Sequence, residues 1–240
     1  MNQSSDTTTR IVILSDFDDT AAEQNVAALL MEKFTPMNAA GGIIDWRDMH
    51  AKFINKKLSL KFYQETAFAM LHNSISDQTN YVSEYASFRT GFLELANYCR
   101  ENGIHIAINS YGLDFYIKAL LSAYNVNWIP FYATETTVTS LETKFEYRFP
   151  REGCDGWGNC KCRIVEGYQS QGCKVVYAGD GMSDICPATR ADFVFARATL
   201  LEFCKTNQLP HKPLVDFRDL IAHIKENNGS SEFVKRIQFD

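Results

Sequence analysis

The stretch "VILSDFDDTAAE", residues 12–23, runs from an apolar segment directly into a group of carboxylates. The segment "RIVILS" (10–15) is short, β-branched and continuous, which predicts a buried strand. Asp16, Asp18 and Asp19 follow that strand at once. Charge is costly beside a buried strand unless a cation or another partner offsets it. The stretch therefore indicates a functional site at the end of the strand.

The rest of the chain divides into two patterns. Residues 21–103 carry apolar side chains at helical spacing and show no strand-like alternation. After Gly103, short β-branched runs alternate with helical segments, which is typical of parallel βαβ units. The expected strands are "IHIAINS", "WIPFYAT", "KVVYAGDG" and "DFVFA", with "TVTSLETKFEYRFP" as a hairpin and helices at "LDFYIKALLSAYN", "CRIVEGYQSQG", "DICPATRA", 197–207 and 216–226. We expect an α/β fold with a doubly wound parallel sheet, in which 10–15 joins the later strands and the helical block is an insertion.

Composition narrows the class of protein. The chain has 240 residues, 45% of them hydrophobic, and a formal net charge of −5. This size fits one large domain or one domain with an insertion, and the acidic balance argues against nucleic acid as a partner. We expect no membrane span and no signal peptide, and seven cysteines without a secretion signal favour reduced thiols in the cytoplasm. Monomer and homodimer both remain open.

Polar residues also follow two of the later strands. Ser110 ends the first of them, and Asp180 and Asp184 follow "KVVYAG". Ligands of open parallel sheets bind beyond the carboxyl ends of the strands, so these residues should converge with Asp16 and Asp18. Carboxylate oxygens so close together need a cation, and hard oxygen ligands suit Mg²⁺.

Four motifs, in this order, resemble those of haloacid dehalogenase-type (HAD) phosphatases. They are "DFDDT" (16–20) for the Asp-x-Asp-x-Thr pattern, "NSYG" (109–112), Lys161 in "NCKCRIV", and "GDGMSD" (179–184). The resemblance implies a Rossmann-like core carrying a helical C1 cap after the first strand. The implied boundaries are 10–22 and 90–226 for the core, 23–89 for the cap, and 1–9 and 227–240 for flexible tails.

The resemblance also implies catalytic roles. Asp16 would be the nucleophile that forms an aspartyl phosphate. Asp18 would protonate the leaving oxygen and then activate water. Lys161 would pair with Asp16 and neutralise the remaining charge.

The same family pattern implies binding roles. Asp16, the backbone carbonyl of Asp18, and Asp180 would hold Mg²⁺, while Asp184 would orient the ligands or the metal's water from behind. A phosphate oxygen would be held by the Ser110 hydroxyl and by backbone N–H groups around Tyr111 and Gly112. Lys161 would contribute to the same phosphate site. Asp19 stands where the family often has glycine, and we expect it to cap a helix.

The substrate is less determined than the reaction. Phosphoserine phosphatases of this family carry a glutamate nine positions after the nucleophile; here Asn25 stands there and Glu23 lies two positions earlier, which weakens a phosphoserine interpretation. The segment "YAGDGMSDICPATRADFVFARATLLEFCKTNQLPHKPLVDF" resembles the 2-hydroxy-3-keto-5-methylthiopentenyl-1-phosphate phosphatases of methionine salvage. That small phosphorylated metabolite is the lead substrate, with phosphocholine, phosphoethanolamine and phosphoserine as alternatives. Trp46 and Arg47, after a possible hinge at Gly41–Gly42, are further candidates for substrate contact.

Three cysteines surround the motif lysine. Cys154, Cys160 and Cys162 have C-x₅-C-x-C spacing, whereas zinc sites usually pair cysteines as C-x₂-C. No fourth ligand lies nearby in the sequence, so reduced thiols are the favoured interpretation, and metal binding and redox activity stay open.

Two other functions remain. A phosphotransferase or phosphomutase would use the same aspartyl phosphate but exclude water. A non-enzymatic metal- or metabolite-binding module is disfavoured, because binding alone needs no acid two residues from a nucleophile.

Overall fold

The computed structural model describes residues 10–35, 45–71, 73–138 and 143–227. The predicted N-terminal tail, the Gly41–Gly42 hinge and all but the first residue of the predicted C-terminal tail lie outside this part. In the described chain, seven strands form one sheet in the order β4-β3-β2-β1-β5-β6-β7. The strands are β1 (Arg10–Ser15), β2 (His105–Leu113), β3 (Phe131–Val138), β4 (Thr143–Glu146), β5 (Cys173–Gly179), β6 (Phe193–Ala196) and β7 (His211–Pro213). Neighbours are parallel except β3 and β4, which are antiparallel.

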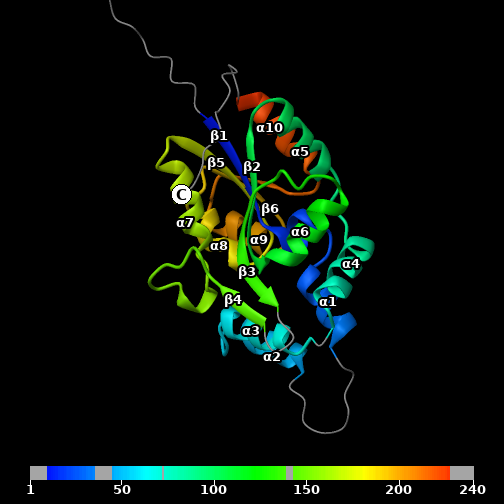
Figure 1. The fold of residues 1–240 in the computed structure, drawn as a ribbon. Helices are drawn as coiled ribbons and strands as arrows, with labels where there is room; N and C mark the ends of the chain where they lie inside the picture. The colour runs from blue at the N-terminus through cyan, green and yellow to red at the C-terminus, as the bar shows by residue number, and fades with distance from the viewer. Residues whose placement is uncertain (1–9, 36–44, 72, 139–142, 228–240) are drawn as a thin grey trace, which may run out of the picture.

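Helices cover both faces of this sheet. Figure 1 places α7 and α8 on one side and α5, α6 and α10 on the other. The helices are α1 (Val26–Phe34), α2 (Trp46–Ile54), α3 (Leu60–Ala69), α4 (Ile75–Tyr85), α5 (Phe92–Glu101), α6 (Asp114–Ala123), α7 (Lys161–Gln169), α8 (Ile185–Ala188), α9 (Ala198–Thr206) and α10 (Arg218–Asn227). The predicted doubly wound α/β fold is confirmed.

The central strand is buried on both faces, as its apolar run predicts. Side chains of a strand alternate between the faces of its sheet. Val12 and Leu14 accordingly pack with Tyr168 of α7, while Ile13 packs with Ile117 of α6. Hydrogen bonding to β2 on one side and β5 on the other fixes the register of β1 and therefore the position of the residues that follow it.

A block of helices separates β1 from β2 in the chain. Figure 1 shows α2 and α3 beyond the ends of the strands, at the lower end of the molecule. Local sequence starts these helices: Ser59 and Ser74 accept backbone N–H groups at the first turns of α3 and α4, and Asn25 does so for α1.

Three expectations are corrected. Strand β3 begins at Phe131 rather than three residues earlier, because Pro130 precedes it, and it continues into the hairpin with β4. The short edge strand β7 was missed. Asp19 caps no helix: its backbone has a left-handed φ of 58°, its carboxylate accepts the Asn25 amide, and Asn25 caps α1 instead.

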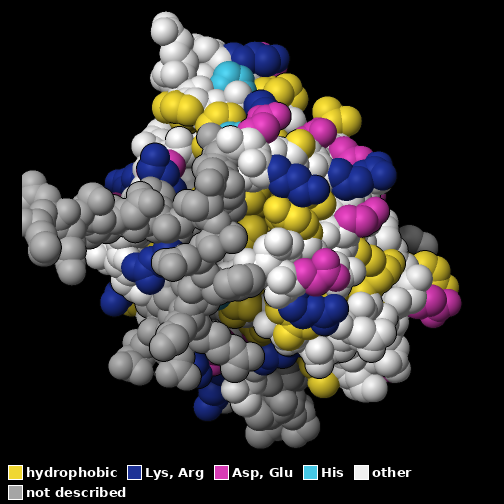
Figure 2. Space-filling model, turned by 90° about the horizontal axis from the view of Figure 1, so that it is seen from above, with side chains coloured by type: hydrophobic (Ala, Val, Ile, Leu, Met, Phe, Trp, Pro, Cys, Tyr) yellow, Lys and Arg dark blue, Asp and Glu magenta, His cyan; other side chains and the backbone are white. Residues whose placement is uncertain are grey.

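The surface and the helices bear on possible partners. No helix among the described residues has the length and apolar character needed to cross a membrane. Figure 2 shows the end of the molecule opposite α2 and α3, where acidic and basic side chains are interspersed over the described residues.

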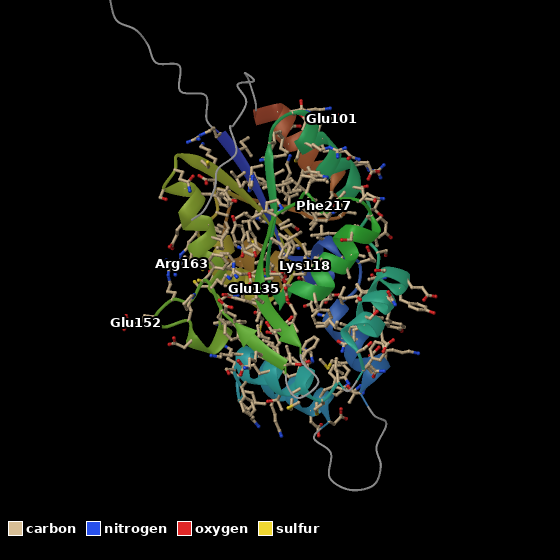
Figure 3. The ribbon with its side chains drawn as sticks, viewed as in Figure 1. Glu101, Lys118, Glu135, Glu152, Arg163 and Phe217 are labelled. Carbon is tan, nitrogen blue, oxygen red and sulfur yellow. The ribbon has the colours of Figure 1, made fainter. Side chains whose placement is uncertain are left out.

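Figure 3 shows Phe217 within the molecule; it packs edge-on against Phe92 of α5.

Candidate active site

The predicted site residues meet at one edge of the sheet. β1, β2 and β5 run parallel, so their carboxyl ends lie side by side. The predicted strand does not stop at Ser110: β2 continues to Leu113, so the second motif lies in its last residues. The Asp16 N–H donates to the carbonyl of Ala178 in β5, which ties the start of the first motif to the adjacent strand. The chain then makes one tight turn, Phe17–Ala21, that brings Asp18 back over the same edge.

A buried lysine links two of the carboxylates. The ammonium of Lys161, at the first position of α7, lies 2.8 Å from an Asp16 oxygen and 2.7 Å from an Asp184 oxygen. The Lys161 side chain is 1% exposed. Burial alone would lower the pKa of this ammonium, but Asp16 and Asp184 outweigh burial and raise it above its ordinary value. Lys161 therefore stays charged, and it makes the contact with Asp16 that its motif implies.

Asp184 is held more firmly than a surface acid would be. It is fully buried and accepts the Tyr177 hydroxyl at 2.7 Å. Its second oxygen accepts the backbone N–H groups of Asp180 and Gly181. Gly179 makes room for it, because a Cβ there would lie 2.7 Å from the Asp184 carboxyl carbon.

The carboxylates form a group that fits a divalent cation. One oxygen each from Asp16, Asp180 and Asp184 lies within 4.8 Å of the others. Burial and then the Asp184 charge raise the pKa of Asp16 well above its ordinary value, and the same two causes raise that of Asp180 to about 6. A hard cation would relieve this repulsion, so the donor set fits Mg²⁺. In the described chain, no such group includes any of the three cysteines around Lys161.

Asp18 points away from that group. One of its oxygens accepts the Val26 and Ala27 N–H groups at the start of α1, and the other accepts the Tyr116 hydroxyl at 2.9 Å. Burial raises the pKa of Asp18 to about 6, although these hydrogen bonds act in the opposite direction. A carboxyl group with that pKa is partly protonated near neutral pH and can act as an acid.

The second motif faces the lysine. The Ser110 hydroxyl accepts the Gly112 N–H at 2.9 Å, and the Lys161 ammonium lies 5.0 Å from the centre of the Tyr111 ring. Gly112 cannot carry a side chain here, because a Cβ would lie 2.0 Å from the Tyr116 hydroxyl. The predicted phosphate-holding residues thus lie beside Lys161 and Asp18.

A pocket of about 410 Å³ joins this edge to the helical block. Its floor is polar, from the motif residues. The wall from α1, α2, α3 and the residue before α1 is formed by Asn25, Ala27, Ala28, Trp46, His50, Phe53, Leu60, Tyr63, Gln64, Ala67 and Phe68. His50 is the one His, Lys, Arg, Asp or Glu side chain among those wall residues.

Two of the four candidate substrate contacts line the pocket, and two do not. Asn25 and Trp46 belong to the wall. Glu23 instead pairs with Arg89, and the Arg47 guanidinium lies over the Trp46 ring with its own side chain 59% exposed.

Several pocket residues were not predicted as functional. Tyr116 and Gln64 contact the motifs directly, since Gln64 donates to the Tyr111 carbonyl at 2.9 Å. Tyr116 and Gln64 occur at helical spacing, which is also the spacing of core residues. The sequence therefore carries no local signal that these two side chains contact the motifs.

Comparison with known proteins agrees with this geometry. Residues 13–188 match the family model of haloacid dehalogenase-like hydrolases. A 2-hydroxy-3-keto-5-methylthiopentenyl-1-phosphate phosphatase from Brevibacillus brevis is 27% identical over 223 residues, covering 90% of this chain and 96% of that protein. The corresponding protein from Geobacillus thermodenitrificans is 26% identical, with the same coverage of both chains.

Solved structures share the fold. A phosphoserine phosphatase solved as a phospho-aspartyl intermediate analogue superimposes with a TM-score of 0.64 at 16% identity, covering 90% of this chain and 99% of that one. A HAD family hydrolase from Salmonella enterica gives a TM-score of 0.68 at 14% identity, covering 90% of this chain and 71% of that one. With its motifs gathered at one edge of the sheet and the family match spanning most of its length, the chain belongs to the haloacid dehalogenase-like hydrolase family.

Proposed function

We propose that this protein is a Mg²⁺-dependent phosphomonoester hydrolase whose substrate is 2-hydroxy-3-keto-5-methylthiopentenyl-1-phosphate. The observation that carries the reaction class is the Asp16–Lys161–Asp184 chain of contacts beside Asp180, at the floor of a pocket of about 410 Å³. Relatives that cover nearly the whole chain bear this substrate's name. The seven free cysteines suit the cytoplasm.

Asp16 is the proposed nucleophile. Its carboxylate oxygen attacks phosphorus, the bond from phosphorus to the substrate oxygen breaks, and an aspartyl phosphate forms. Lys161, 2.8 Å away, balances the charge that the phosphate brings next to Asp16. Bound Mg²⁺, held by Asp16, Asp180 and the Asp18 carbonyl with Asp184 behind them, would shield the attacking carboxylate from the phosphate charge.

Asp18 is the proposed acid and base. Its protonated form gives a proton to the departing oxygen, and the resulting carboxylate takes a proton from the water that hydrolyses the aspartyl phosphate. The hydrogen bonds from Tyr116 and the start of α1 hold the group in one orientation through both steps.

The helices α1–α4 are the proposed cap, and their wall suits an uncharged, apolar leaving group. A thioether packs well against aromatic rings, which Trp46, Phe53, Tyr63 and Phe68 supply. Phosphoserine carries an ammonium and a carboxylate, whereas His50 is the one ionisable histidine, lysine, arginine or carboxylate side chain among the wall residues. The same rings could hold a quaternary ammonium by cation–π attraction, so phosphocholine is the second candidate.

A substrate panel tests the proposal. We expect phosphate release with kcat/KM highest for the methylthiopentenyl phosphate, lower for phosphocholine and lowest for phosphoserine. Asp16→Asn should release no phosphate from any of them, because an amide cannot attack phosphorus, and this variant also controls for contaminating phosphatases. Running the assay in ¹⁸O-water places the label in the released phosphate for a hydrolase. Full activity of Asp16→Asn, or unlabelled product transferred to another acceptor, would contradict the proposal.

A further inference from the structure

Two cysteines from different helices lie against each other beside the site. The Sγ atoms of Cys162 in α7 and Cys186 in α8 are 2.7 Å apart, and both are free thiols. A disulfide bond is about 2.05 Å long, so the sulfurs need to approach by only about 0.7 Å. Cys186 joins the three cysteines around Lys161. Because it is 24 residues from Cys162 in the sequence, the sequence analysis did not predict this contact.

The surroundings give the two thiols different accessibility. Cys186 is exposed, and Arg190 donates from Nη1 to its sulfur at 2.9 Å. An accessible sulfur beside a guanidinium is the environment of reactive cysteines. Cys162 is 2% exposed, and burial and the Cys186 sulfur raise the pKa of its thiol. An exposed thiol with a second thiol in contact is the arrangement found in cysteines that respond to oxidants.

We propose that Cys162 and Cys186 form a thiol oxidation site at which hydrogen peroxide produces a reversible disulfide. The Cys186 sulfur attacks one peroxide oxygen and the O–O bond breaks. Sulfenic acid forms, and the leaving hydroxide takes the proton of the Cys186 thiol to become the first water. The Cys162 sulfur then attacks the sulfenic sulfur, the S–O bond breaks, and water leaves as the disulfide forms. The two cysteines lose two electrons together, and the peroxide takes them up to give two waters.

The cross-link would lie next to the proposed catalytic lysine. Cys162 follows Lys161 in the chain, and Cys186 lies two residues after Asp184. The Lys161–Asp184 ion pair therefore spans the same two segments that the disulfide would draw together. Figure 3 shows Arg163, the next residue of α7, on the outer side of the molecule, so the start of this helix lies between the site and the surface. A shift of about 1 Å near reacting groups can lower turnover by about 100-fold.

The chemistry is tested on the full chain without any activity assay. After treatment with hydrogen peroxide, the intact mass should fall by two hydrogen atoms, and peptide mapping should find Cys162 joined to Cys186. Dithiothreitol should reverse both changes. Cys186→Ser, a change at an exposed position, should abolish the cross-link, whereas the matched variant Cys154→Ser should still form it. A cross-link through another pair, or oxygen added to Cys186 with no cross-link, would overturn the site.

The effect on turnover rests on the proposed function and has its own readout. We expect the oxidised protein to lose at least about fivefold in kcat on 4-nitrophenyl phosphate, with recovery in dithiothreitol. Cys186→Ser should keep its activity after the same treatment. Unchanged activity of fully cross-linked protein would refute the link to Lys161, whereas a reduced protein that hydrolyses no phosphoester would instead count against the proposed function.

Discussion

Asp18 is oriented through both of its oxygens. The backbone at the start of α1 binds one oxygen and Tyr116 binds the other, while burial keeps the pKa of the carboxyl near 6. These hydrogen bonds hold the Asp18 carboxyl in one orientation, which is what the proposed acid role requires. Tyr116 donates this hydrogen bond from α6.

Tyr116→Phe should lower turnover without unfolding the protein. A hydrogen bond to a charged group contributes about 1.5–3 kcal/mol, so we expect kcat to fall by about 10- to 100-fold on an alkyl phosphate. The fall should be smaller on 4-nitrophenyl phosphate, whose leaving group needs little protonation. Tyr85→Phe, at an exposed position of α4, is the matched control. Equal losses on both substrates would contradict the orienting role.

Individual residues were predictable where a motif specifies them in a few letters. Asp16, Lys161, Asp180 and Asp184 lie where their motifs placed them. Tyr116 was not predictable, because a fully buried tyrosine at helical spacing has the pattern of core. The left-handed backbone of Asp19, which excluded its capping role, depends on contacts made far along the chain.

At the scale of elements, one buried arginine fixes the turn after β1. Arg89 donates to the carbonyls of Asp19 and Thr20 and pairs with Glu23. These carbonyls lie in the turn that positions Asp18, and Arg197 donates to the Asp19 carbonyl as well. The segment before α5 therefore supports the first motif from behind.

Arg89→Met should destabilise the protein by about 2–4 kcal/mol, because it removes the donor to the carbonyl of buried Thr20 and the cation that pairs with Glu23. Urea unfolding measures this. Arg47→Met removes ion pairs between half-exposed side chains and should cost about 1 kcal/mol or less. Equal midpoints for the two variants would show that Arg89 contributes nothing beyond a surface charge.

Whether a segment is a helix or a strand was predictable from the spacing of its apolar residues where the segment was long enough to show that spacing. The buried strand 10–15 and the helices after it carry clear patterns. Strand β7 has three residues at the edge of the sheet, paired to β6 alone, and no alternation can be read from so short a run.

At the scale of the whole molecule, we expect the carboxylate group to make stability depend on a bound cation. Asp16 directly follows β1, and Asp180 and Asp184 follow β5, so the repulsion among these carboxylates opposes the contact between the two strands. A cation that binds only the folded protein would remove this repulsion.

Adding Mg²⁺ to EDTA-treated protein should therefore raise the midpoint of thermal unfolding. At a concentration of 100 Kd, the stabilisation expected from mass action is about 2.7 kcal/mol. In Asp180→Asn the shift should shrink, and the metal-free variant should be at least as stable as the metal-free parent. Differential scanning calorimetry measures both quantities. An Mg²⁺ shift of full size in this variant would remove Asp180 from the metal site.

The global architecture was more predictable than the pocket. Alternating strands and helices imply the sheet, and the order of motifs implies which strand ends face the site. The wall of the pocket combines side chains from α1, α2 and α3, whose relative placement depends on tertiary packing that no local pattern encodes.

The central position of β1 affects how the chain is made. Its partners are far along the sequence, since Val12 pairs with His105 and Arg10 with Cys173. During synthesis, this apolar strand leaves the ribosome long before either neighbour exists, and closing such distant pairings is slow. We therefore expect nascent chains that end before β5 to bind chaperones through β1 and to gain protease resistance only after β5 emerges.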